Sequence, residues 1–320
     1  MHVRPRIVCP SAEGDLAALF VAEPLRSRLA ALGDVEIAVD RPDLDELVRR
    51  VAQADVVLLA THLPDEALCR AAGRLRLISF TGTGAASYVN LPLAAELGVT
   101  VSNVTHYGDQ AVAELTFALM LAAARDVPTG DRAVRAGRWS GWPGRELSGS
   151  RLAVLGFGGI GRAVARLGVA FGMQVGVWDR VLDPTAMAAL GVVPIEWSEA
   201  FAWAEVVSLH LPLTAETRGM VTEVELDQLS PGTILVNTAR GELLAPGALA
   251  RRMARGDVRA ALDVFDPEPL SPEDPLLAVP GTVFTPHLGF RTPAALARMA
   301  EGAVANVEAF LTGKPTRVVT

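Results

Sequence analysis

Short apolar runs alternate with amphipathic segments along most of the chain. Between residues 43 and 53, apolar residues recur at positions 44, 47, 48 and 51, which is the spacing of one helix face. The strand-like runs of the first hundred residues are 6–9, 35–39, 55–59, 75–80 and 99–102. Short strands that alternate with amphipathic helices predict a parallel sheet covered on both faces.

A second series of the same kind begins near Gly149 and extends to about residue 287. Its strand-like runs are 151–155, 173–177, 206–210, 233–237, 260–264 and 282–285. A helix that is apolar nearly all round, 111–125, precedes this series, and a final helix, 292–311, follows it. The pattern therefore predicts two α/β units connected by a buried helix.

The stretch 126–149, between the connecting helix and the second series, is rich in Gly, Pro, Arg and Trp. Its length and composition favour an arm over a packed element. It carries Trp139 and Trp142, and large aromatic side chains on such an arm are typical interface anchors. We expect the chain to form a homodimer through this arm.

Composition narrows the class of protein. The chain of 320 residues is half hydrophobic and one-fifth charged, which excludes a disordered protein. Its net charge of −7 and the absence of a Lys or Arg run argue against nucleic acid as a partner. No apolar run approaches the roughly 18 residues of a membrane helix, and no secretion signal is apparent. We expect no membrane partner and no metal site.

The two cysteines, Cys9 and Cys69, lie far apart in the sequence. Cys9 ends an apolar strand, so a buried free thiol is the better interpretation. Free thiols are typical of reducing compartments, and we therefore expect a cytoplasmic location.

The most informative motif is Gly156-Phe157-Gly158-Gly159-Ile160-Gly161, which lies between a predicted strand and a predicted helix. A second strand follows and ends at Asp179, which completes the order of a dinucleotide-binding unit. Gly156 allows a tight turn, Gly158 lets the backbone approach a pyrophosphate, and Gly161 lets the helix pack closely. The free N–H groups at the start of the helix favour phosphates. This motif predicts a nicotinamide or flavin dinucleotide.

Asp179 bears on the choice of cofactor. An acid at this position accepts hydrogen bonds from the adenosine ribose hydroxyls, and its charge repels a 2′-phosphate. Arg180 beside it could instead stack on adenine or meet a phosphate. We predict NAD over NADP.

Arg240, Glu268 and His287 each follow a strand end in the second series. Ligands of open α/β sheets bind beyond the carboxyl ends of the strands, so these side chains are expected at one edge. Hydride transfer to a keto acid requires a cation for the carboxylate and an acid that supplies a proton. The planar fork of Arg suits the first role, and a His beside a carboxylate suits the second. Each residue alone has an ordinary explanation, as a helix cap, a loop carboxylate or a surface histidine, but their coincidence points to catalysis.

Over essentially its whole length, the chain resembles the D-isomer-specific 2-hydroxyacid dehydrogenase family. Besides the glycine loop, the matching runs are Leu-His-Leu-Pro-Leu-Thr at 209–214, Asn-Thr-Ala-Arg-Gly-Glu-Leu at 237–243, Ala-Leu-Asp-Val-Phe-Asp-Pro-Glu-Pro at 261–269 and Thr-Pro-His at 285–287. The resemblance implies two doubly wound parallel-sheet domains with a cleft between them. Residues 103–287 would form a Rossmann domain that binds NAD, and residues 1–102 with 288–320 a flavodoxin-like substrate domain. The implied activity is NAD-dependent interconversion of small 2-keto and 2-hydroxy acids.

The resemblance also implies roles for single residues. His287 would be the acid/base, Glu268 its partner and Arg240 the clamp on the substrate. Asp263 would hold the nicotinamide carboxamide. The substrate would be held by Arg240, His287 and the backbone N–H groups of the loop Thr81, Gly82, Thr83 and Gly84. The full set of expected cofactor contacts is the glycine loop 156–161, Asp179, Arg180, His210, Pro212, Thr217, Thr238, Ala239, Arg240, Asp263, His287 and Gly289.

The chain departs from the family pattern around the expected cleft. The run 85–90 differs from the usual sequence, and His106 and Tyr107 stand where Pro-Gly is more usual. Gly159 replaces a frequent Arg, and Arg291 replaces a small or apolar residue. Arg291 could favour a dianionic substrate, although a solvent-facing Arg at a helix start is the simpler explanation. Glyoxylate, hydroxypyruvate, a longer 2-keto acid and a phosphorylated acid all stay open as substrates.

Two other functions are compatible with the same fold. A dinucleotide-sensing binding protein could lose the three polar residues without penalty, and this chain keeps all of them. A dehydrogenase of phosphite or formate would have different residues around Arg240, Glu268 and His287, and the sequence therefore disfavours this alternative. Both stay as alternatives to the keto acid reductase.

Overall fold

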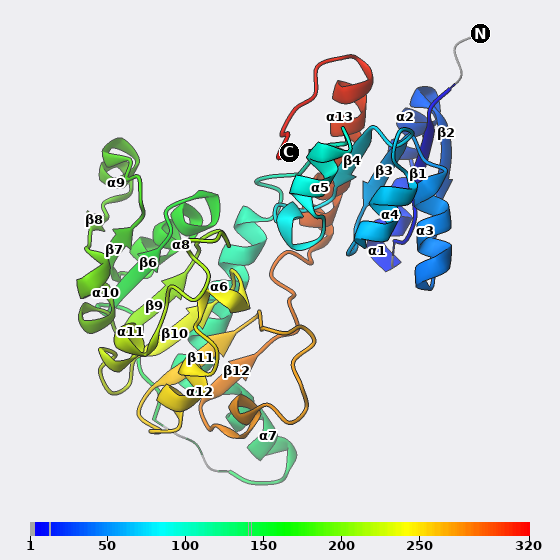
Figure 1. Cartoon of the computed structure of the whole chain (residues 1–320). Coiled ribbons are helices and arrows are strands. Elements are labelled where there is room, and N and C mark those ends of the chain that lie inside the picture. Colours follow the sequence, from blue (N-terminus) through cyan, green and yellow to red (C-terminus); the bar gives the residue numbers. More distant parts are fainter. Residues whose placement is uncertain (1–3, 13, 140, 142) are drawn as a thin grey trace. The chain divides into compact units, whose positions relative to one another are not determined.

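The structure is a computed structural model that describes residues 4–12, 14–139, 141 and 143–320. The chain divides into two compact units, Met1–Gly108 with Arg291–Thr320, and Asp109–Phe290 (Figure 1). The boundaries expected from the sequence, after 102 and after 287, lie a few residues before those of the compact units. Two parallel sheets covered by helices confirm the expected fold class, whereas the cleft and the division of roles between the units stay predictions.

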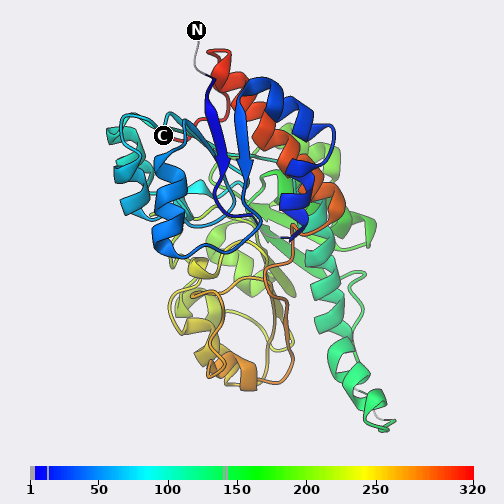
Figure 2. The same cartoon turned by 90° about the vertical axis from the view of Figure 1, so that its right-hand side faces the viewer.

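The first unit contains a five-stranded parallel sheet in the order β2-β1-β3-β4-β5. Helices α3, α4 and α5 cover one face, and α1, α2 and α13 cover the other (Figure 2). Its strands are β1 (Arg6–Cys9), β2 (Asp34–Ile37), β3 (Val56–Leu59), β4 (Leu77–Phe80) and β5 (Thr100–Ser102). Its helices are α1 (Gly14–Val21), α2 (Leu25–Leu32), α3 (Leu44–Ala52), α4 (Asp65–Arg70), η1 (Ala85–Ser87), α5 (Leu91–Glu96) and α13 (Pro293–Leu311).

The second unit contains a seven-stranded parallel sheet in the order β12-β11-β10-β9-β6-β7-β8. Helices α6 and α8 pack on one face, and α10, α11 and α12 pack on the other. Its strands are β6 (Arg151–Leu155), β7 (Gln174–Trp178), β8 (Val193–Pro194), β9 (Val206–Leu209), β10 (Ile234–Asn237), β11 (Arg259–Leu262) and β12 (Thr282–Phe284). Its helices are α6 (Asp109–Arg125), α7 (Val127–Arg135), α8 (Gly159–Ala170), α9 (Pro184–Leu190), α10 (Trp197–Trp203), α11 (Glu223–Asp227), η2 (Gly241–Leu243), α12 (Ala248–Met253) and η3 (Pro275–Ala278).

The strand order of the second sheet reverses at β6. The chain passes from β6 to β7 and β8 on one side and then returns to β9, which pairs with the other side of β6. The loops that follow β6 and β9 therefore diverge at the carboxyl ends of the strands. Such a switch point is where open α/β sheets bind their ligands.

Local sequence explains where two of the helices begin. Asp43 caps α3 by accepting a hydrogen bond from the backbone N–H of Glu46 at 2.9 Å. Thr292 caps α13 in the same way, through the N–H of Ala295 at 3.2 Å. Helix α3 buries Leu47, Val48 and Val51, as their spacing predicts, whereas Leu44 at its first position is 50 % exposed.

The expected arm, 126–149, begins with a helix instead of irregular chain. Asp126 takes a left-handed backbone (φ +51°) between α6 and α7, and α7 projects from its unit (Figure 2). Gly130 within α7 is a poor helix former, and for this reason the composition of the segment did not predict a helix here. Trp139 is 94 % exposed, and Trp142 lies outside the described residues. The homodimer stays a prediction.

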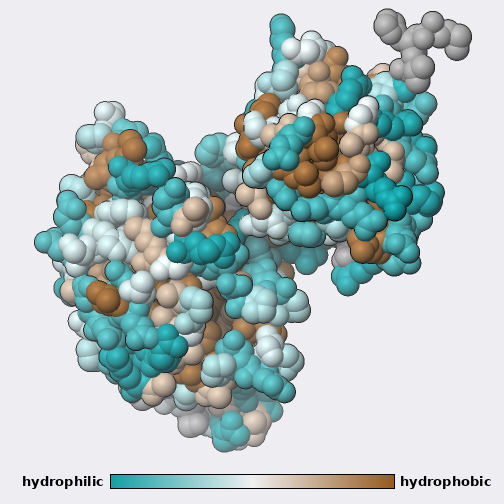
Figure 3. All heavy atoms as spheres, viewed as in Figure 1, coloured by the Kyte–Doolittle hydropathy of each residue, from teal (hydrophilic) through white to brown (hydrophobic). Residues whose placement is uncertain are grey.

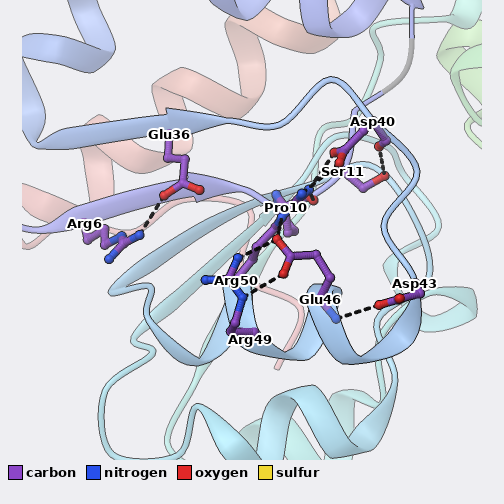
Figure 4. A network of polar contacts seen from close by, with 9 residues as sticks. All are labelled: Arg6, Pro10, Ser11, Glu36, Asp40, Asp43, Glu46, Arg49 and Arg50. Atoms are coloured by element: carbon purple, nitrogen blue, oxygen red, sulfur yellow. Dashed lines mark hydrogen bonds and ion pairs between the residues drawn. The ribbon is translucent and has the colours of Figure 1, made fainter.

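Charged side chains pair with one another at the carboxyl ends of β1 and β2 (Figure 4). Arg50 of α3, only 12 % exposed, donates to both carboxylate oxygens of Asp40 at 2.6 and 2.8 Å. It also donates to Glu46 Oε1 at 2.6 Å and to the carbonyl of Pro10 at 2.8 Å. Hydrogen bonds from Arg49 and Arg50 lower the pKa of Glu46 to about 2. We call this group, with Arg50 at its centre, the Arg50 network.

Cys9 is a buried free thiol, as expected, and burial raises its pKa to about 12. The described helices include none that is long and apolar enough to cross a membrane. Nor do the described residues gather His, Cys, Asp and Glu side chains in a group that could hold a metal ion. On the faces seen in Figure 3, hydrophobic side chains form small groups among hydrophilic ones.

Candidate active site

The site residues expected in the second unit follow neighbouring strands of its sheet, at the carboxyl edge. The glycine loop follows β6, His210 follows β9, and Arg240 comes three residues after β10. Asp263 follows β11, and His287 follows β12. Because every strand pair in this sheet is parallel, these residues share one edge.

The glycine loop has the steric properties that a dinucleotide requires. Gly156 has φ +105°, and a Cβ there would lie 2.5 Å from the carbonyl oxygen of His210. A Cβ at Gly161 would overlap the carbonyl oxygen of Gly156, so only glycine allows α8 to start so close to β6. At Gly158, by contrast, a Cβ would meet nothing within 4 Å. The open space there is the room that a bound phosphate needs.

Backbone N–H groups at the start of α8 are available to a ligand. Arg162 is the first residue whose N–H bonds to a carbonyl of this turn, that of Gly158, at 2.9 Å. Among the described residues, none accepts a hydrogen bond from the N–H groups of residues 158–161. These are the four donors that a helix start leaves open, and they favour an anion.

Asp179, after β7, accepts a hydrogen bond from the backbone of the glycine loop. Its Oδ2 accepts a hydrogen bond from the N–H of Phe157 at 2.6 Å, and Oδ1 lies 3.4 Å from the N–H of Val181. The carboxylate keeps lone pairs that ribose hydroxyls could use. Arg180 is exposed, and its charge contributes to holding the pKa of Glu216 below its ordinary value, after the larger effect of the Thr214 hydroxyl.

His210 carries a buried nitrogen that lacks a partner. Its Nε2 lies 2.8 Å from the hydroxyl of Ser208, whereas Nδ1 is buried without a hydrogen bond among the described residues. Burial lowers the pKa of His210 to about 3, so the ring is neutral at pH 7. A buried polar atom without a partner is one that a bound ligand can satisfy. After His210, the hydroxyl of Thr217 closes the next turn by donating to the carbonyl of Pro212 at 2.6 Å.

The turn after β10 is shaped by Asn237, which the sequence analysis did not single out. Its Oδ1 accepts from the N–H of Ala239 at 3.0 Å, and its Nδ2 donates to the carbonyl of Arg240 at 2.8 Å. The hydroxyl of buried Thr238 lies 2.8 Å from that of Thr116 on α6. These bonds fix the backbone that presents Arg240.

Arg240 and Glu268 come together because the loops after β10 and β11 pack tightly. A Cβ at Gly241 would overlap the backbone of Phe265, so glycine is needed for this approach. Arg240 Nη1 donates to the carbonyl of Ala239 at 2.7 Å. The positive charge of Arg240 is one of the smaller effects that lower the pKa of the Glu268 carboxylate.

Glu268 and His287 form the central pair of the site. His287 Nδ1 lies 2.8 Å from Glu268 Oε2, and Glu268 Oε1 accepts from the N–H of Phe265 at 3.0 Å. Burial alone would raise the pKa of Glu268, but the bonds from His287 and Phe265 and the charges of His287 and Arg240 outweigh it, so the pKa lies below its ordinary value. His287 Nε2 has no hydrogen bond to any described residue. The ring is thus oriented through one nitrogen and free at the other.

Asp263 builds the loop that presents His287. His287 has φ +53°, a left-handed conformation that is uncommon for a non-glycine residue. Its N–H donates to the carbonyl of Asp263 at 2.8 Å. The Asp263 carboxylate accepts from the hydroxyl of Thr285 at 2.6 Å and from the N–H groups of Leu288 and Gly289, both at 2.8 Å. Three protein donors therefore bind a carboxylate for which the family resemblance implied only a contact with the cofactor.

The loop 81–84 lies in the first unit, after β4. Among the described residues, no acceptor is found for the N–H groups of Gly82, Thr83 and Gly84, so three successive amides are available to an anion. A Cβ at Gly82 would lie 3.7 Å from the Tyr107 hydroxyl, which places this unusual side chain beside the loop. Two other residues that depart from the family pattern are His106, which has φ +63°, and Arg291, which is exposed.

Comparison with known proteins gives the family of the chain. Residues 117–289 match the sequence profile of the D-isomer specific 2-hydroxyacid dehydrogenase, NAD binding domain. A glyoxylate reductase of Aeropyrum pernix is 37 % identical over 294 residues, which cover 88 % of this chain and 88 % of that protein. A D-3-phosphoglycerate dehydrogenase of Mycobacterium tuberculosis is 38 % identical over 307 residues, 93 % of this chain but only 58 % of the relative's length.

Solved structures agree over the whole length. The crystal structure of the TT0316 protein from Thermus thermophilus has a TM-score of 0.84 and 35 % identity, and the match covers 98 % of this chain and 99 % of that one. A glyoxylate reductase from Paecilomyes thermophila has a TM-score of 0.87 and 26 % identity, with 100 % and 99 % covered. The chain belongs to the D-isomer-specific 2-hydroxyacid dehydrogenase family, and its second unit contains the domain with which that family binds a nicotinamide dinucleotide.

Proposed function

We propose that the chain is an NAD-dependent dehydrogenase that interconverts small 2-keto and D-2-hydroxy acids. The observation that carries the proposal is the Glu268–His287 pair, at 2.8 Å, whose free Nε2 lies at the same sheet edge as the glycine loop and Arg240. The relatives named as glyoxylate reductase, hydroxypyruvate reductase and D-3-phosphoglycerate dehydrogenase all act on this class of compound.

The residues divide the chemistry among themselves. When bound, the nicotinamide would supply the hydride that adds to C2 of the keto acid. His287 Nε2 donates a proton to the carbonyl oxygen at the same time, and the carboxylate of Glu268 stabilises the imidazolium before the transfer. Arg240 binds the substrate carboxylate and polarises the carbonyl through its planar fork. In the first unit, the free amides of the loop 81–84 would offer hydrogen-bond donors to a carboxylate.

The cofactor would be NAD in preference to NADP. Asp179 supports this choice, because its carboxylate offers lone pairs to ribose hydroxyls and repels a 2′-phosphate. The expected result is a larger kcat/KM with NADH than with NADPH. A larger kcat/KM with NADPH would mean that Arg180 dominates the contact.

We also propose that the chain forms a homodimer through the arm 126–149. Trp139, Val127 and Val134 are exposed on this stretch, and a partner would cover their apolar surface. Light scattering at micromolar protein should give the mass of a dimer. A monomer mass would contradict this part of the proposal.

A panel of substrates tests the proposed function. Glyoxylate, hydroxypyruvate, pyruvate, a longer 2-keto acid and 3-phosphohydroxypyruvate are each mixed with the protein and NADH, and the loss of NADH absorbance is followed. At least one keto acid should be reduced. NAD⁺ is also offered with formate and with phosphite, and turnover with only one of these would favour that alternative. Binding of NADH without turnover on any compound would favour a sensor.

A further inference from the structure

One face of α13 contacts the segment through which the chain leaves the first unit. Arg298, Gly302 and Asn306 are spaced four residues apart and therefore lie on one side of the helix. Arg298 Nε donates to the carbonyl of Tyr107 at 2.8 Å, and Asn306 Nδ2 donates to the carbonyl of Asn103 at 2.8 Å. Between them, a Cβ at Gly302 would lie 2.5 Å from the side chain of Val104. The segment 103–107 is thus held along α13.

Asn103 connects this helix to the loop 81–84. Its carbonyl accepts from Asn306, and its own Nδ2 donates to the carbonyl of Thr83 at 2.8 Å. The adjacent Val104 adds two bonds, because its N–H donates to the carbonyl of Gly82 at 3.0 Å and its carbonyl accepts from the Thr83 hydroxyl at 3.1 Å. The loop is therefore fastened at Gly82 and Thr83.

The C-terminal segment completes the network. Asn306 is fully buried, and its Oδ1 accepts from Arg317 Nη1 at 2.8 Å and from the Thr316 hydroxyl at 3.3 Å. The N–H of Asn103 donates to the carbonyl of Arg317 at 3.1 Å. Beyond it, Val318 pairs with Ser102 of β5. Buried amides that are satisfied in this way specify one arrangement of the chain.

The geometry of the peptide bond makes these contacts relevant to binding. In a trans peptide the N–H points away from the carbonyl of the same unit. The carbonyls of Gly82 and Thr83 are directed toward Val104 and Asn103, so the N–H groups of Thr83 and Gly84 must point to the opposite side. The network therefore decides the direction of two of the three free amides.

We propose that Asn103 and Asn306 are positioning residues that aim the N–H groups of Thr83 and Gly84 at the carboxylate of the substrate. Asn103 acts on the Thr83 carbonyl directly, and Asn306 acts through Asn103. The identity of the bound carboxylate rests on the proposed function, whereas the coupling of α13 to the loop does not.

The test compares Asn103→Ala and Asn306→Asp with the control Ser79→Ala. Asn306→Asp keeps the volume and the acceptor for Arg317 but loses the donor to Asn103. Ser79 is also buried and also bonds to α13, through the carbonyl of Ala303 at 2.9 Å, but it bonds to no residue of the loop 81–84. The orientation of the N–H groups at 81–84 is measured for each variant from NMR residual dipolar couplings. KM for the keto acid, kcat and NADH affinity are measured beside it.

The N–H groups of Thr83 and Gly84 should change orientation in both asparagine variants. KM for the keto acid should rise about three- to tenfold, the effect of one lost hydrogen bond, with kcat within about twofold and NADH affinity unchanged. Ser79→Ala should lower the unfolding temperature and leave the N–H orientations and KM as in the wild type. If one asparagine variant does not fold, the other decides by the same measurements.

Unchanged N–H orientations and unchanged KM in a folded asparagine variant would overturn the proposal. An equal rise of KM in Ser79→Ala would also overturn it, because the effect would then come from general loss of stability. If the wild type reduces no keto acid, the proposed function fails, and the N–H orientations alone decide whether Asn103 and Asn306 orient the loop.

Discussion

The carboxyl ends of β1 and β2 in the first unit differ from the carboxyl edge of the second sheet, although both follow parallel strands and both carry charged side chains. In the Arg50 network, Arg50 and Arg49 pair with the carboxylates of Asp40 and Glu46. At the second edge, within the described residues, His287 Nε2, His210 Nδ1 and the N–H groups of 158–161 find no partner. Polar groups satisfied by the protein stabilise it, and those left unsatisfied are available to a ligand.

The two regions also differ in their backbone. At the second edge, His287 has φ +53° and is held there by Asp263, and Gly156 and Gly241 permit contacts that a side chain would block. Uncommon backbone conformations persist only where the surroundings fix them, and they gather at functional sites. If the comparison is correct, changes at the second edge alter catalysis, and changes in the Arg50 network alter stability.

The largest effect is expected for His287→Asn, because it removes the only proton donor of the proposed reaction. We expect kcat to fall by about 10²–10⁴-fold, the usual effect of positioned acid–base catalysis. NADH affinity, followed by quenching of the tryptophan fluorescence, should change little. Near wild-type turnover would show that His287 is not the acid and that another group supplies the proton.

The next largest effect is expected for Arg240→Lys. Lysine keeps the charge but loses the planar fork, so one of two parallel hydrogen bonds to the carboxylate disappears. We expect kcat/KM for the keto acid to fall about 10–100-fold, with a higher KM and a lower kcat. Steady-state kinetics measure both, and unchanged values would mean that Arg240 does not contact the substrate.

Glu268→Gln should change the pH dependence more than the maximal rate. The imidazolium of His287 loses the carboxylate that stabilises its charge, and keto acid reduction requires this protonated form. The alkaline limb of the pH–rate profile should therefore move to lower pH by about one unit or more. A limb at the wild-type pH would contradict the assigned pairing of Glu268 with His287.

Smaller effects are expected in the Arg50 network, and they concern stability. The pKa of Glu46 is lowered from 4.5 to about 2 in the folded protein. The ionised Glu46 therefore stabilises the folded protein above pH 4.5, and this stabilisation is lost as the pH falls toward 2. The unfolding temperature of Glu46→Gln should depend less steeply on pH in this window, and its kcat and KM at pH 7 should equal those of the wild type. A lower kcat in Glu46→Gln would contradict the inference that the Arg50 network serves stability alone.

Much of the second edge could be predicted from the sequence, because strand ends and the glycine loop are local patterns. The start of α8 could not, because Gly159 and Gly161 are poor helix formers and the helix begins there through packing against β6. The structural roles of Asp263 and Asn237 within their loops could not be predicted from a local pattern either. Their bonds to Leu288 and Arg240 depend on how separate loops meet, and a residue's type does not reveal its partners.

Isotope transfer tests the central claim most directly. NADH that carries deuterium at both C4 positions is mixed with a keto acid and wild type, His287→Asn or Arg50→Ala protein in a single turnover, and deuterium at C2 of the product is measured by NMR. The account predicts equal transfer by wild type and Arg50→Ala, and transfer slower by about 100-fold or more in His287→Asn despite normal NADH binding. Comparable transfer by His287→Asn, or product without deuterium at C2, would contradict it.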